Sequence, residues 1–145
     1  MRVLISGSRN WPSFRMVQNI LNDAYWRAEE AGDLPLRVRH GNAPGADTCA
    51  AAWVRMAQRA DWDVYNEPFP AEWQHEGCTH PKGVRNGDWY CKAAGPLRNQ
   101  RMLDHPGRID EAHFFPAEDS RGTWDMWDRA EAAGIPCFNH GAERG

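Results

Sequence analysis

The sequence lacks any run of apolar residues long enough to cross a membrane, which takes about 20 such residues. The first residues also lack the pattern of a signal peptide, in which positive charge precedes an apolar stretch. Basic charge is not in excess, because 17 Lys and Arg stand against 20 Asp and Glu and give a net charge of -3. Nucleic-acid-binding proteins usually carry a basic face. We therefore expect a cytoplasmic protein that does not act on a membrane or on nucleic acid.

Other absences limit the fold and the chemistry. No internal repeat, low-complexity segment or second domain is visible, so residues 1–145 are expected to form one domain. The Gly-x-Gly-x-x-Gly fingerprint of dinucleotide-binding dehydrogenases is missing, and we expect no redox cofactor. Cysteine is scarce, with four residues, which in a cytosolic protein indicates thiols or metal ligands before disulfides. Tryptophan, by contrast, is abundant, and its eight residues make exposed aromatic loops and a homodimer plausible.

Short apolar segments alternate with segments of helical periodicity along the whole chain. The expected strands are the run that follows Arg2 and residues 36–40, 62–66, 111–115 and 135–139. The expected helices run from Ser13 to Gly32 and over residues 47–60, 93–103 and 123–133. This order predicts a three-layer α/β/α fold with a mainly parallel, five-stranded sheet. Ligands of such sheets bind beyond the carboxyl ends of the strands.

The residues of unusual chemistry fall on the loops at those strand ends. Residues His40–Asp47 form a glycine-containing turn between a strand and a helix, where the amides of the first helical turn attract anions. Gly41 and Gly45 would let the backbone turn tightly and approach a ligand. The alternative is an ordinary strand-to-helix turn in which Asp47 is a first-turn acid.

Two further loops carry the same kind of groups. Residues Gly7–Trp11 place a hydroxyl, a guanidinium and an indole at the end of the first strand, although Arg9 and Trp11 could equally be surface residues over the first helix. Gly122 and Thr123 enter another helix, where first-turn amides and the Thr hydroxyl can hold a phosphate. Thr123 as a simple N-cap is the alternative there.

Five motifs in this order resemble the YspA-like, YpsA-related branch of the SLOG superfamily, which also contains DprA and the Lonely Guy phosphoribohydrolases. They are Gly-Ser-Arg-x-Trp from Gly7, His-Gly-x-Ala-x-Gly-Ala-Asp from His40, Ala-Gly-x-x-Arg-Asn-x-x-Met from Ala94, Gly-Thr-x-x-Met from Gly122, and Gly-Ile-Pro from Gly134. The resemblance covers residues 2–138. It implies a Rossmann-like fold that binds a nucleotide or a nucleotide-derived ligand, in a branch common in actinobacteria and their phages.

The resemblance also bears on catalysis. Arg98 looks like the counterpart of the helical Arg of Lonely Guy enzymes, and Gly122 and Thr123 match their Gly-Thr pair. Met126 stands where those enzymes carry Glu, and methionine can neither stabilise an oxocarbenium-like species nor activate water. Asp125 is one position away from the matched face, so Asp47 would be the substitute acid. This departure favours a binding or sensing role over N-glycosidic hydrolysis, with single-stranded DNA binding as a third alternative.

Taken together, the loops define a predicted ligand site. Its expected members are Gly7, Ser8, Arg9, Trp11, His40, Gly41, Ala43, Gly45, Asp47, Arg98, Asn99, Gly122 and Thr123. Phosphates would lie on the amides near Gly45 and Gly122, with Arg9 and Arg98 as counter-charges and Trp11 against the base or ribose. If the protein is an enzyme, Arg98 and Asp47 are the expected catalytic residues.

The segment 74–92 is expected to be an irregular inserted loop tied by a metal ion. His75, Cys78, His80 and Cys91 supply two imidazoles and two thiolates, a set that suits tetrahedral zinc. Four protein ligands leave no open position, so such a zinc would be structural. The alternatives are two free thiols or a disulfide between Cys78 and Cys91.

Overall fold

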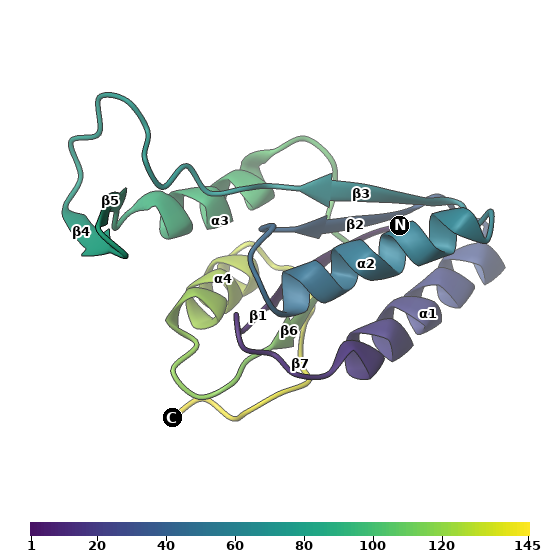
Figure 1. Cartoon of the computed structure of the whole chain (residues 1–145). Coiled ribbons are helices and arrows are strands. Elements are labelled where there is room, and N and C mark those ends of the chain that lie inside the picture. Colours follow the sequence, from purple (N-terminus) through teal and green to yellow (C-terminus); the bar gives the residue numbers. More distant parts are fainter.

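Five parallel strands form one sheet in the order β3-β2-β1-β6-β7 (Figure 1). The computed structural model describes all residues, 1–145. The strands are β1 (Arg2–Gly7), β2 (Leu36–His40), β3 (Val64–Pro68), β6 (Glu111–Phe115) and β7 (Cys137–Asn139). The prediction of a five-stranded parallel sheet is therefore confirmed.

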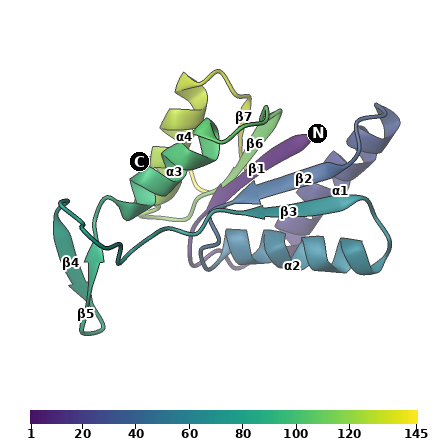
Figure 2. The same cartoon turned by 90° about the horizontal axis from the view of Figure 1, so that it is seen from above.

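Two pairs of helices cover the two faces of this sheet, which makes the fold three-layered and Rossmann-like (Figures 1 and 2). The helices α1 (Phe14–Glu30) and α2 (Ala46–Arg59) lie on one face, and α3 (Ala94–Asp104) and α4 (Arg121–Ala132) lie on the other. Alternate residues of β1 point to opposite layers: Val3 belongs to the core under α1 and α2, and Leu4 to the core under α3 and α4. Because both faces are covered, the strand is apolar without alternation. None of the helices combines the length and the apolar character that a membrane crossing requires.

The predicted elements match the observed ones to within one or two residues at most ends. Ser13 caps α1 as expected, because its hydroxyl oxygen accepts a hydrogen bond of 3.2 Å from the amide of Met16. The helix α4 begins at Arg121, so Thr123 is its third residue and not its N-cap, and that alternative is wrong. The cap position is held by Ser120.

The segment expected to be irregular contains a β-hairpin that the sequence analysis missed. Its strands β4 (Lys82–Arg85) and β5 (Asp88–Cys91) pair antiparallel and extend away from the main sheet beside the start of α3 (Figures 1 and 2). Asn86 and Gly87 connect the strands with positive φ angles of 52° and 83°. An Asn-Gly pair in this conformation is a strong hairpin signal, and it was available in the sequence.

Candidate functional site

The loops that follow β1 and β2 pack directly against each other at the carboxyl edge of the sheet. The carbonyl oxygen of Ser8 accepts hydrogen bonds from the amides of Trp11 (3.2 Å) and Ala46 (3.3 Å). Gly45 has a φ of +87°, and a Cβ at this position would collide with the Ser8 carbonyl. The space that the glycine leaves is thus taken by protein. Gly45 serves to join the two loops, and it leaves no opening there for a ligand.

Asp47, on the first turn of α2, is buried with one of its carboxyl oxygens unpaired. Its Oδ2 accepts hydrogen bonds from the amides of Gly41 (3.1 Å) and Ala43 (3.2 Å), and its Oδ1 has no protein partner. Burial raises the pKa of Asp47 to about 6, although the bond from Ala43 and the charges of Arg98 and Arg9 act in the opposite direction. The site therefore holds a carboxyl group that titrates near neutral pH and has one oxygen free to accept a hydrogen bond.

Arg98 of α3 lies near this carboxyl group, and the two side chains bind the carbonyl and the amide of Gly41 without forming a direct ion pair. Its Nη1 donates to the carbonyl oxygens of Gly41 and Phe69, and its Nε donates to the Asn99 side chain at 3.1 Å. Its Nη2 makes no hydrogen bond to the protein. Burial lowers the pKa of Arg98, and the charge of Asp47 acts to raise it. A side chain at Gly41 would collide with the guanidinium, which explains the glycine at that position.

Asn99 connects Arg98 to the start of α4. Its amide nitrogen donates to the carbonyl oxygen of Gly122 (3.2 Å) and to Asp125 (2.9 Å), and its oxygen holds Arg98. The first turn of α4 has no acidic residue and no side-chain cap, because the Ser120 hydroxyl accepts from the Ala117 amide instead. A Cβ on Gly122 would meet no atom within 4 Å. The amides of Gly122 and Thr123 therefore have no protein partner, whereas those of Gly41 and Ala43, in the turn before α2, bind Asp47.

Other predicted site residues have structural partners. Both ring nitrogens of His40 are engaged: Nδ1 accepts from the amide of Asn42 (3.0 Å), which leaves the proton on Nε2, 2.7 Å from the Asn66 side chain. Trp11 packs edge-on against Phe115, and its indole donates to the carbonyl of Ser13 at 3.0 Å. These contacts direct the two rings toward the protein's own loops.

Arg9 is exposed, unlike His40 and Trp11, whose rings face the protein's own loops. Its charge acts on the pKa of both Asp47 and Arg98, so it lies near the pair. Its guanidinium lies over the ring of Trp73, 5.2 Å from the centroid. Arg9 therefore links the carboxyl edge to the segment that leads into the hairpin.

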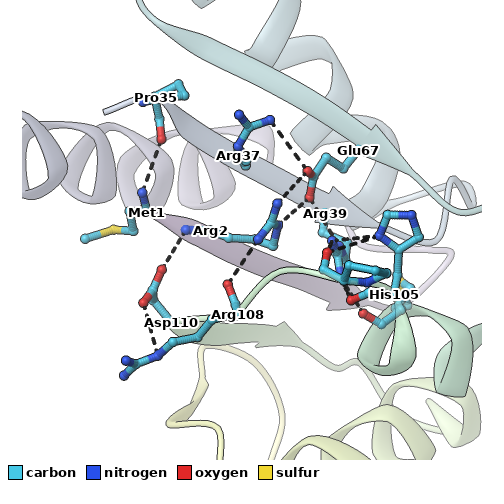
Figure 3. Close-up of polar contacts among 11 residues, drawn as sticks. Met1, Arg2, Pro35, Arg37, Arg39, Glu67, His105, Arg108 and Asp110 are labelled. Carbon is cyan, nitrogen blue, oxygen red and sulfur yellow. Dashed lines mark hydrogen bonds and ion pairs between the residues drawn. The ribbon is translucent and has the colours of Figure 1, made fainter. Parts of the chain in front are cut away.

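A buried ion network, which the sequence analysis missed, anchors the other end of α3 (Figure 3). Arg39 of β2 is fully buried and donates to the carbonyl oxygen of Met102 at 2.6 Å, near the last turn of α3. Glu67 of β3 accepts from Arg39 (3.2 Å) and from Arg2 (2.8 Å). Because α3 carries Arg98, this network holds the helix that positions the guanidinium.

The four predicted metal ligands come together at the hairpin, where they could hold a metal ion. Their donor atoms all lie within 4.8 Å of one another. Nδ1 of His80 is 3.8 Å from the Cys78 sulfur and 3.6 Å from the Cys91 sulfur, and Nε2 of His75 is buried without a partner. Zinc bonds of about 2.3 Å to sulfur and about 2.0–2.1 Å to nitrogen place tetrahedral donors roughly 3.3–3.8 Å apart. The two separations from His80 agree with these values, the widest separation in the cluster exceeds them, and both cysteines are free thiols.

Comparisons with known proteins agree with this architecture. The model of the YspA, cpYpsA-related SLOG family matches residues 1–75, which include the turn that carries Asp47. The Gene 61 protein of Mycobacterium phage D29 is 34% identical over 140 residues, which cover 97% of this chain and 96% of that protein. The family match ends at the first predicted metal ligand, so the hairpin and Arg98 lie beyond it.

Proposed function

The chain belongs to the YspA, cpYpsA-related SLOG family, and from this membership we propose that it binds or senses a phosphorylated nucleotide or nucleotide-derived ligand. Membership of the SLOG family suggests nucleotide-related binding or processing. The observation that carries the proposal is the Asp47–Arg98 pair, two side chains that meet at the Gly41 backbone without a direct ion pair. Asp47 Oδ1 and Arg98 Nη2 both lack protein partners. A free acceptor and a free charged donor on either side of Gly41 suit a ligand with both hydroxyl and phosphate groups.

The two helix starts would take different parts of this ligand. A phosphate is favoured at Gly122 and Thr123, whose amides have no protein partner and whose helix carries no acid in its first turn. Arg98, tied to Gly122 through Asn99, would be a counter-charge for this phosphate. The carboxylate of Asp47 would repel a phosphate at the start of α2 but would accept a hydrogen bond from a ribose hydroxyl.

A second candidate function, hydrolysis of an N-glycosidic bond, is favoured by the pKa of Asp47, which burial raises to about 6. Such a carboxyl can act as a general acid or base near neutral pH. Asp125 cannot take this role without breaking its contacts to Asn99 and Arg129, each 2.9 Å long. Release of free base from AMP by the wild type, and its absence in Asp47→Ala, would establish the enzyme; without it, the binding role stands.

Titration calorimetry against nucleoside monophosphates, NAD and ADP-ribose tests the binding proposal. We expect at least one phosphorylated compound to bind with one site per chain. If every phosphorylated nucleotide in the panel fails to bind, the proposal is wrong.

We also propose that His75, Cys78, His80 and Cys91 hold a structural zinc ion. The mixed sulfur and nitrogen donor set, the short separations and the unpartnered His75 nitrogen support it. The ion would stabilise the hairpin, which has few apolar contacts of its own.

Elemental analysis of protein purified without added metal tests the zinc site. We expect about one equivalent of zinc, because structural sites bind tightly. Cys78→Ser should lose the ion, while Cys49→Ser, a partly buried cysteine on α2 outside the cluster, should keep it. Less than about half an equivalent in the wild type, or equal loss from both variants, would contradict the site.

A further inference from the structure

A hollow of about 270 Å³ lies on the hairpin, apart from the Asp47–Arg98 pair. Its lining combines aromatic, charged and amide side chains: Trp73, Gln74, Arg85, Asp88, Trp89 and Tyr90. Trp73 and Gln74 immediately precede the proposed metal ligand His75, and Trp89 and Tyr90 immediately precede the proposed metal ligand Cys91. The hollow is therefore built by the same short segment that brings the metal ligands together.

The backbone fixes the walls of this hollow. The amide of Cys91 donates to the Trp73 carbonyl at 2.6 Å, and Gln74 donates to the Trp89 carbonyl at 2.7 Å. Tyr90 lies across the hairpin from Gly83, where a Cβ would come within 2.6 Å of its ring. The glycine thus leaves room for the tyrosine ring to lie on the hairpin, where it forms part of the wall of the hollow.

Stacked cations and rings connect this hollow to the carboxyl edge of the sheet. The guanidinium of Arg85 is 4.8 Å from the Tyr90 centroid, the rings of Tyr90 and Trp73 are 6.2 Å apart, and Arg9 is 5.2 Å from Trp73. Arg9 in turn belongs to the loop that packs on Gly45, where a Cβ would come within 2.7 Å of the Arg9 backbone. A ligand held at the edge could therefore extend along this row toward the hairpin.

We propose that the hollow is a slot for the nucleobase of the ligand whose phosphate and ribose are held at the carboxyl edge. This inference rests on the proposed function. Pockets for whole drug-sized ligands measure about 300–1,000 Å³, so a hollow just below that range suits one ring system and not an entire nucleotide. Trp89, which is 39% exposed, lines the hollow, and any base can stack on an accessible aromatic ring.

The polar side chains that line the hollow would orient a stacked base through hydrogen bonds. The carboxylate of Asp88 has no ion-pair partner in the protein, and the side-chain oxygen of Gln74 is left free when its nitrogen binds Trp89. Both are acceptors, and an exocyclic amine is the donor that a base such as adenine presents. The slot is thus expected to favour amino-substituted bases.

Calorimetry with paired probes tests the slot. The four nucleoside monophosphates are compared with ribose 5-phosphate, which has the same phosphate and sugar but no base. We expect at least one nucleotide, AMP first, to bind about five- to 150-fold more tightly than ribose 5-phosphate, the range for one stacked base. Trp89→Ala should remove this preference without weakening ribose 5-phosphate, and Trp89→Phe should retain most of it.

Trp26→Ala is the matched control, because Trp26 is a half-exposed tryptophan on α1. It should leave the preference unchanged. If ribose 5-phosphate binds as tightly as every nucleotide, or if Trp89→Ala keeps the preference, the slot is overturned while the phosphate site stands. If neither the nucleotides nor ribose 5-phosphate bind, the proposed function itself fails, and the slot with it.

Discussion

Asp47 is buried at the candidate site, and its ionised form destabilises the folded protein. Its pKa in the folded protein, about 6, lies above the ordinary value of 3.8 because the carboxyl is buried. The folded state therefore binds the proton more tightly than the unfolded state. The free energy that this tighter proton binding adds to folding is fully present below about pH 4 and is lost as the pH rises through about 6.

Asp47→Asn should make the protein more stable at pH 8 by about 2–3 kcal/mol and change it little at pH 4. The amide oxygen can still accept from Gly41 and Ala43, and its NH₂ group replaces the unpaired Oδ1. Urea denaturation at several pH values measures the difference, with Asp63→Asn, an exposed acid, as the control. A gain that is the same at pH 4 and pH 8 would show that ionisation of Asp47 is not its cause.

The position of Asp47 at the site could be predicted from its motif, since strand, glycine-containing turn and helix follow in sequence. Its burial and unpaired oxygen could not, because they depend on Arg98 arriving from a helix 51 positions further along the chain. The role of Gly45 could not be predicted either, because it too depends on a residue that is distant in the sequence. A glycine in a turn is equally compatible with a close ligand and with a close loop, and only the packing against Ser8 decides.

The helix α3 is held at both ends by polar contacts. Near its start, Arg98 and Asn99 bind the turn after β2 and the first turn of α4. Near its end, Arg39 binds the Met102 carbonyl and is paired with Glu67. Burial acts to raise the pKa of Glu67, but the hydrogen bond from Arg2 and the charges of Arg39 and Arg2 outweigh it, so the pKa is lowered.

Glu67→Gln should destabilise the protein by about 3 kcal/mol at pH 7, because it leaves Arg39 buried without its counter-charge. The lowered pKa means that the ion pair stabilises the fold above the ordinary value of 4.5 and that this effect is lost as the pH falls through the lower, folded value. Wild type and variant should therefore approach each other in acid. Glu29→Gln, an exposed residue of α1, is the control for denaturation measurements. A constant difference down to pH 3 would contradict the electrostatic origin.

The helices and main strands were predictable because their apolar spacing is local. The Arg39–Glu67 pair was not, since it requires knowing that β2 lies beside β3. The hairpin could have been predicted from Asn86 and Gly87, but the strands around them are short and polar, so periodicity gave no signal there.

In the whole molecule, the candidate site joins two halves of the chain. Asp47 belongs to the part that the family model matches, residues 1–75, whereas Arg98 and Gly122 belong to the part beyond it. The hairpin extends from the molecule next to the start of α3 (Figure 2). Trp73, which precedes the hairpin, lies against Arg9, and a Cβ at Gly95 would come within 3.5 Å of its ring. The proposed base slot thus lies on the hairpin, and the proposed sugar and phosphate site lies at the sheet edge. Homodimer formation stays a prediction.

The central claim is that the Asp47–Arg98 pair binds the phosphorylated ligand. Its most direct test is calorimetry of Arg98→Gln and Arg101→Gln with whichever nucleotide of the panel binds most tightly to the wild type. Arg101 is an exposed arginine on the same helix that donates to the Pro70 carbonyl, so its variant controls for lost charge. We predict that Arg98→Gln loses about tenfold or more in affinity, the worth of a charge-assisted hydrogen bond, and that Arg101→Gln stays within about twofold. Equal affinity of folded Arg98→Gln and wild type would contradict the account.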